Sequence, residues 1–247
     1  MLVFNKERIL FEKQTLQGYC QVVEKIYSHR PARLLYSGKV RTAQSGIALD
    51  DSILMLFGYN QRFIEIVDQM EGLKNILLIG GGVYTLPTSI SALNDFVNID
   101  IVEPNEELDE IAVKYFEYKT NSKTMIYHVG GQEFLKTSTK KYDLIIIDAY
   151  HEDQIPEDFQ SISFTKLIKQ ALSIGGTVAF NIISSLRPDS PINKFQEYYA
   201  SEFSSVVVYS ADHEKSDYYY DQNFVLVASD HSIDFRLKYP PLASSVN

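Results

Sequence analysis

Cysteine is almost absent from this sequence: Cys20 is the only one among 247 residues. A single cysteine cannot form an intramolecular disulfide, and it excludes every metal site that is built from a cluster of cysteines. The five histidines are scattered and lack metal-ligand spacing, so we expect no bound metal. A reducing cytoplasm is the compartment that fits this composition.

Long apolar runs and excess positive charge are also missing. No stretch approaches the ~20 apolar residues of a membrane span, and the first 14 residues carry scattered charges. We therefore expect no signal peptide and no membrane partner. The formal net charge of −9 disfavours binding to a nucleic-acid backbone and is compatible with a cationic substrate.

The chain divides by pattern into three predicted parts. Residues 1–58 hold short β-prone segments separated by turn signals, which predicts a small antiparallel β region. Over residues 59–232 strands and helices alternate, as in a parallel sheet that is covered on both faces. Residues 233–247 are predicted to be a C-terminal tail.

Hydrophobic periodicity places the elements of the main part. Apolar residues at helical spacing, such as Phe63, Ile66, Val67 and Met70, predict helices. Short apolar runs predict strands, and the last helix before a late strand pair starts at Pro191. The expected helices are 61–72, 85–94, 106–118, 164–172 and 191–203, and the expected strands are 76–79, 99–102, 124–129, 142–148, 177–182, 206–209 and 224–227.

Residues 75–103 carry the most informative pattern. An apolar strand is followed at once by Gly80, Gly81 and Gly82, then by a helix and a second strand that ends on Glu103. Glycines suit a sharp turn at which a ligand approaches the bare backbone. An acid about 20 residues further on can accept hydrogen bonds from the two hydroxyls of a ribose. This unit predicts a nucleoside-binding site.

The whole layout predicts an α/β fold. Five alternating strands plus a final pair are typical of the Rossmann-like, S-adenosylmethionine-dependent methyltransferase type of sheet. In open sheets of this kind ligands bind beyond the carboxyl ends of the strands. Gly80, Glu103 and Asp148 stand at those ends.

Over residues 19–230 the chain resembles the spermidine synthases, or polyamine aminopropyltransferases, as a divergent bacterial branch. One motif that carries the resemblance is ILLIGGG with the later VEPNEELDEIAVKYF. The most specific is YDLIIIDAYHEDQIP with the helix and strand after it. A weaker match is Gln44-Ser45-Gly46 with Phe57-Gly58-Tyr59.

The resemblance implies transfer of an aminopropyl group from decarboxylated S-adenosylmethionine to a diamine, without a metal. It gives Asp148 the role of the catalytic aspartate, Tyr59 that of a substrate-facing tyrosine, and Asp153 that of a second acid. Glu103 is implied to hold the ribose, beside a loop lined by the three glycines. Gln44 is included among the nucleoside-binding residues, and a homodimer is expected.

Two departures from the family pattern bear on the donor. The family's glycine loop usually continues with an aspartate that meets the aminopropyl amine, whereas Val83 stands here. The family's acid that contacts the adenine amine is also missing, and Gln132 could pair with adenine in its place. Loss of one charge-assisted hydrogen bond costs about 1.5–3 kcal/mol. The choice between decarboxylated and ordinary S-adenosylmethionine therefore stays open.

Three functions remain at this point. The first is aminopropyl transfer, for which Asp148, Asp153 and Asp50 or Asp51 could converge on an amine. The second is methylation of a small molecule by S-adenosylmethionine. The third is a non-catalytic nucleoside-binding relative, although such a protein has no reason to keep both Glu103 and Asp148.

Overall fold

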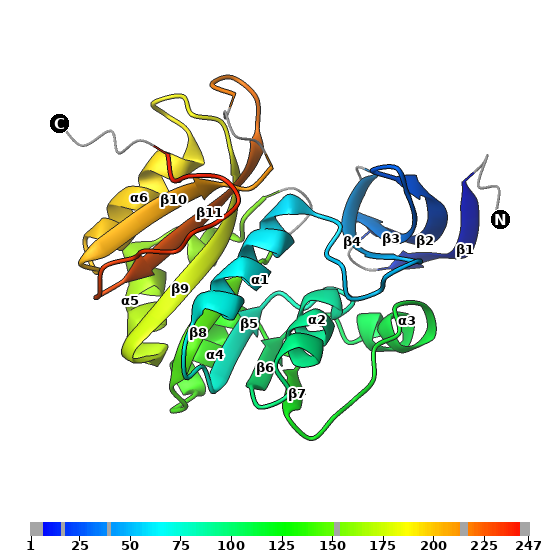
Figure 1. Cartoon of the computed structure of the whole chain (residues 1–247), viewed down its shortest axis with the longest axis horizontal. Coiled ribbons are helices and arrows are strands. Elements are labelled where there is room, and N and C mark those ends of the chain that lie inside the picture. Colours follow the sequence, from blue (N-terminus) through cyan, green and yellow to red (C-terminus); the bar gives the residue numbers. More distant parts are fainter. Residues whose placement is uncertain (1–6, 16–17, 39–40, 151–153, 213–216, 243–247) are drawn as a thin grey trace.

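The computed structural model describes residues 7–15, 18–38, 41–150, 154–212 and 217–242. They form two sheets, a small one at the N-terminal end and a large one with helices on both faces (Figure 1). The predicted fold class is confirmed. Among these residues no helix has both the length and the apolar character to cross a membrane.

The small sheet is antiparallel and lies at one end of the molecule, beside α2 and α3 (Figure 1). Its strand order is β1-β2-β3-β4. Val23, Ala32 and Leu34 are fully buried in a small core of its own, whereas Val22 and Leu35 on its other face join a core of the large sheet. The strands are β1 Arg8–Thr15, β2 Gly18–Tyr27, β3 Arg30–Gly38 and β4 Thr42–Ala48.

The large sheet has seven strands in the order β10-β11-β9-β8-β5-β6-β7. The strands from β5 to β9 pair in parallel, whereas β11 runs antiparallel to β9 and β10 runs antiparallel to β11. The strands are β5 Asn75–Ile79, β6 Asn98–Val102, β7 Thr124–Tyr127, β8 Tyr142–Ile147, β9 Leu172–Ser184, β10 Ser205–Ser210 and β11 Gln222–Ser229.

Alternate residues of the central strands enter two separate cores. Leu78 and Ile146 belong to the core under α1, α2 and α3, whereas Leu77 and Ile147 belong to the core under α4, α5 and α6. Burial on both faces explains why these strands are continuously apolar. The helices are α1 Gly58–Gln69, α2 Thr85–Leu93, α3 Glu107–Tyr115, α4 Gly131–Thr137, α5 Ile162–Ala171 and α6 Pro191–Ala200, with a 3₁₀ turn η1 at Glu157–Phe159.

Two local predictions were wrong. The sequence analysis gave no helix after β7, because α4 spans only seven residues and shows little periodicity. It also began the strand after the fifth helix only at residue 177, because Gly175-Gly176 resembles a stop signal for that helix. The helix ends at Ala171, and β9 already begins at Leu172, with Gly175 at φ +81° inside it. The division of the chain at residues 58 and 232 stays a prediction.

Candidate active site

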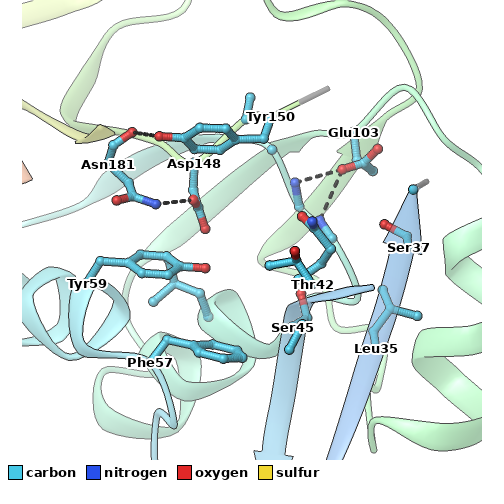
Figure 2. Close-up of a pocket in the computed structure, with 18 of the residues that line it drawn as sticks. Leu35, Ser37, Thr42, Ser45, Phe57, Tyr59, Glu103, Asp148, Tyr150 and Asn181 are labelled. Atoms are coloured by element: carbon cyan, nitrogen blue, oxygen red, sulfur yellow. Dashed lines mark hydrogen bonds between the residues drawn. The ribbon is translucent and has the colours of Figure 1, made fainter. Parts of the chain in front are cut away.

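A pocket of about 870 Å³ lies where the two sheets meet. One wall consists of the carboxyl ends of β5, β6, β8 and β9, and the other of β3, β4 and the start of α1 (Figure 2). Its size is that of a site for a small organic ligand. The pocket brings together Tyr59, Gln44, the three glycines, Glu103 and Asp148, all of which the sequence analysis singled out.

The glycine loop has no room for side chains. Gly80 has φ +94°, and a Cβ there would stand 2.1 Å from the carbonyl oxygen of Asp148. Gly82 has φ +51°, and its Cβ would stand 2.7 Å from Oγ of Ser45 in the small sheet. Glycine is the residue that adopts these angles without strain. The loop thus lies against both walls of the pocket through bare backbone.

The carboxylate of Glu103 holds this loop in place. Its Oε2 accepts hydrogen bonds from the backbone N–H groups of Gly81 and Gly82, each at 3.0 Å, and its Oε1 accepts from Asn105 N at 3.0 Å. Burial raises the pKa of Glu103, and these three hydrogen bonds oppose that rise. A carboxylate offers about four acceptor positions. One position on Oε1 therefore remains for a ligand hydroxyl.

Asp148 lies half-buried at the opposite end of the pocket, directly after β8. Its Oδ1 accepts a hydrogen bond of 3.0 Å from Nδ2 of Asn181 in β9. Figure 2 shows the Tyr59 hydroxyl turned toward Asp148 from α1, with Tyr150 on the other side. The Tyr150 hydroxyl donates to the carbonyl of Asn181 at 2.9 Å and accepts from Ile183 N at 2.8 Å.

Burial is the main cause of the pKa shifts at this end of the pocket. It raises the pKa of Asp148 to about 6, against the opposing effect of the hydrogen bonds from Asn181 and Tyr59. Burial, followed by the charge of Asp148, raises the pKa of Tyr59 far above its ordinary value. Near neutral pH the carboxylate is thus ionised and the tyrosine is a neutral hydrogen-bond donor. A carboxylate poised near pH 6 is suited to accept a proton.

Three predicted residues are not at the pocket. Gln132 is absent from its lining, and the side-chain amide donates to the carbonyl oxygen of Asp158 at 3.0 Å. Asp50 forms an ion pair of 3.0 Å with Arg30 away from the pocket, and Asp51 is likewise not in the lining. Asp153 lies outside the described residues.

The residue after the glycines, Val83, is absent from the lining of the pocket. Val83 is fully buried in the hydrophobic core, so the loop presents no side chain of this residue to a ligand. Tyr84 follows in the left-handed conformation with φ +59°. Its buried hydroxyl donates to Asp109 at 2.5 Å, which satisfies the polar group of a tyrosine in this position.

Carboxylates outnumber cations among the described residues that line the pocket. Glu103, Asp148 and Glu157 are acidic, and Arg41 is basic. The Arg41 guanidinium already pairs with Glu7, and it lies 4.7 Å from the ring of Tyr36. The lining is therefore net negative, which favours a positively charged ligand.

Asn181 and Tyr150 contribute to the site but were missed in the sequence analysis. The signal for Asn181 was a single amide within the buried apolar run TVAFNII. A buried polar residue needs hydrogen-bond partners, and here one of them is Asp148. Tyr150 stood two residues after Asp148, but nothing in the sequence indicated that its hydroxyl reaches the next strand.

A model of the spermine/spermidine synthase domain matches residues 57–211, which is more than half of the chain. The chain belongs to this family. The polyamine aminopropyltransferase of Vibrio vulnificus is 30% identical over 115 residues, which make up 45% of this chain and 38% of that protein. The family resemblance that the motifs indicated is confirmed.

Spermidine synthase structures share this fold. A probable spermidine synthase from Corynebacterium glutamicum superposes with a TM-score of 0.74 at 18% identity, over 92% of this chain and 81% of that one. A spermidine synthase in complex with the transition state analogue AdoDATO gives 0.69 at 17% identity, over 91% and 74%. The matched segments cover only 38–45% of the length of the first curated relatives.

Proposed function

We propose that this pocket binds decarboxylated S-adenosylmethionine and transfers its aminopropyl group to the nitrogen of a small amine. The observation that carries the proposal is the pair of carboxylates at the two ends of one pocket. Glu103 stands beside the glycine loop, and the half-buried Asp148 stands between Tyr59 and Tyr150. Family membership and the spermidine synthase relatives support the same reaction class.

The nucleoside belongs at the end formed by Glu103 and the glycine loop. The remaining acceptor position on Oε1 suits one ribose hydroxyl, and a second hydroxyl competes with a glycine N–H for Oε2. Apolar side chains nearby, including Ile79, Val102 and Phe159, line the space for a flat adenine. The loop offers no acidic side chain to the donor, because the residue after the glycines is Val83. Its side chain is buried in the core.

The amine belongs at the end formed by Asp148. The amine nitrogen bonds to the carbon next to the sulfonium, the carbon–sulfur bond breaks, and the electron pair stays on sulfur, which leaves methylthioadenosine. Asp148 accepts the proton that the nitrogen loses, and the Tyr59 hydroxyl helps to orient the nitrogen. Fixing the two reactants in line contributes roughly 7–11 kcal/mol to such a reaction.

Methyl transfer from S-adenosylmethionine is the second candidate. The observation that favours it is the buried Val83 after the glycines. A valine there leaves the loop without a carboxylate that would select an aminopropyl amine. The net negative lining weighs against it, because S-adenosylmethionine carries an additional carboxylate. Arg41 is the one basic side chain among the described lining residues.

Calorimetric titration with methylthioadenosine, S-adenosylmethionine and decarboxylated S-adenosylmethionine distinguishes the two. The proposal predicts that the decarboxylated form binds more tightly than S-adenosylmethionine. Tighter binding of S-adenosylmethionine would favour methyl transfer, and no binding of any of the three would contradict both. Homodimer formation and a cytoplasmic location stay predictions; light scattering after size-exclusion chromatography tests the first.

A further inference from the structure

Asn181 is the most unusual polar residue of the pocket. It lies in the middle of β9, with 2% of its surface exposed, between the apolar Phe180 and Ile182. Those neighbours point into the core under α5 and α6, whereas Asn181 and Ile183 face the pocket. A buried amide in such a strand is costly unless it forms hydrogen bonds.

The amide nitrogen of Asn181 fixes the Asp148 carboxylate. Nδ2 donates to Oδ1 of Asp148 at 3.0 Å. An ionised carboxylate only accepts hydrogen bonds, so the amide must turn Nδ2 toward it and Oδ1 away from it. The contact leaves the other acceptor positions of the carboxylate for Tyr59 and a substrate.

Tyr150 fixes the backbone of Asn181 in turn. β8 ends at Ile147, which pairs with Phe180, so β9 has no strand partner beyond that point on this side. The Tyr150 hydroxyl supplies the hydrogen bonds that a neighbouring strand would make, because it donates to Asn181 O and accepts from Ile183 N. The side chain of Asn181 therefore starts from a backbone that is held on both sides, by Tyr150 and by β11.

The amide oxygen of Asn181 has no partner. Among the described residues only four buried side-chain nitrogen or oxygen atoms lack a hydrogen bond, and Oδ1 of Asn181 is one of them. Asn60, which also lines the pocket, holds another unpartnered amide oxygen. An unsatisfied buried acceptor destabilises the protein, and a hydrogen bond from a ligand N–H group would offset that cost.

We propose that Asn181 is the positioning residue of the site: its Nδ2 orients Asp148, and its free Oδ1 accepts an N–H group of the amine substrate. This inference rests on the proposed function. A protonated primary amine has three donors and no acceptor. Asp148 and Asn181 offer it only acceptors, so the pair selects an amine over a ligand that needs a donor from the protein.

Two substitutions of Asn181 separate the two roles. Asn181→Leu removes both the donor and the acceptor, whereas Asn181→Asp keeps acceptor oxygens but replaces the amide donor by a second carboxylate beside Asp148, so that the pair shares one proton up to a higher pH. Without the donor the Asp148 carboxylate is less stabilised, so it protonates at a higher pH in both variants. Its titratable neighbours are Tyr59 and Tyr150, and the pKa of each is raised, so both stay neutral.

The measurement is the affinity for 1,4-diaminobutane of protein saturated with methylthioadenosine, titrated by calorimetry from about pH 5 to about pH 9. Alkylamines titrate near pH 10.4, so the ligand keeps its charge over most of this range. For the wild type we expect the affinity to fall below a pH of about 6. In both variants the fall should move to higher pH, and only Asn181→Leu should also lose about tenfold or more at the high-pH plateau.

Several results would overturn the inference. They are an unchanged pH dependence in both variants, an unchanged plateau in Asn181→Leu, a parallel loss of methylthioadenosine affinity, and no diamine binding by the wild type. If Asn181→Leu does not fold, Asn181→Ser replaces it, because a serine hydroxyl is too short to reach Asp148. None of these titrations requires turnover, so failure of aminopropyl transfer in a separate assay is distinguishable from failure of this inference.

Discussion

Asp148 links the chemistry of the site to the stability of the protein. Its side chain is half-buried in the wall of the pocket, and desolvation there raises its pKa to about 6, whereas an exposed aspartate titrates near 3.8. The folded protein therefore holds this proton more tightly than the unfolded chain does. Between these two pH values the unfolded chain binds fewer protons, so the free energy of unfolding decreases as the pH rises.

Asp148→Asn should therefore stabilise the protein while it removes the proposed base. The shift of roughly 2 pKa units corresponds to about 2–3 kcal/mol at pH 8, because the neutral amide avoids the cost of a buried charge. Chemical denaturation of both proteins at pH 8 and at pH 3.5 tests this. At the lower pH Asp148 is protonated, and the difference should vanish. A variant that is less stable than the wild type at pH 8 would contradict the account.

Glu103→Ala should weaken binding of methylthioadenosine by a factor of about 10 or more, the value of one charge-assisted hydrogen bond. The substitution also releases the N–H groups of Gly81 and Gly82. The exposed Glu110→Ala, on α3, is the matched control and should bind as the wild type does. Unchanged affinity of the Glu103 variant would remove Glu103 from the nucleoside site.

Sequence reasoning found the site residues that stand at strand ends. Glu103 and Asp148 each follow an apolar run, and parallel strands bring their carboxyl ends to one edge of the sheet. It could not place Gln132, since the orientation of a side chain in the first turn of α4 depends on contacts with the segment around Asp158. It also missed Asn181, whose role depends on the neighbouring strand rather than on any local motif.

At the scale of elements, two glycines with a left-handed backbone differ in what surrounds them. Gly80 and Gly72 both have positive φ, +94° and +71°, but they differ in surroundings. A Cβ at Gly80 would meet the backbone of Asp148 at 2.1 Å, whereas a Cβ at Gly72 would meet nothing within 4 Å. The first glycine is needed for both conformation and space, and the second for conformation alone.

Gly80→Ala should thus cost much more than Gly72→Ala. We expect the Gly72 variant to lose about 1–2 kcal/mol of unfolding free energy from left-handed strain alone, with methylthioadenosine binding unchanged. The Gly80 variant should lose more than that and bind methylthioadenosine poorly, because β5 and the segment after β8 must move apart. Equal stability and equal binding of the two variants would show that the close approach at Gly80 is not needed.

The elements themselves were largely predictable because each buries a regular face. Residues 76–79 of β5 and 144–147 of β8 are apolar throughout, since helices cover both faces of the sheet. α4 was not predicted, because its seven residues hold too few apolar positions to show a helical period. The start of β9 was predicted too late in the chain, because Gly175-Gly176 resembles a helix stop. Both glycines lie within the strand.

At the scale of the whole molecule, the pocket exists because two sheets meet. The large sheet supplies Glu103 and Asp148, and the small sheet closes the space with β3 and β4. The sequence predicted both sheets separately. Their contact through Ser45 and Gly82 could not be predicted, since it depends on long-range packing rather than on periodicity.

The most direct test of the account is turnover. The protein is incubated with decarboxylated S-adenosylmethionine and 1,4-diaminobutane, and methylthioadenosine and spermidine are measured by mass spectrometry. We expect both products in equal amounts, a rate that falls below a pH of about 6 as Asp148 protonates, and a loss of at least about 100-fold in Asp148→Asn with methylthioadenosine affinity retained. Nucleoside binding without either product, or an Asp148→Asn variant as active as the wild type, would contradict the central claim.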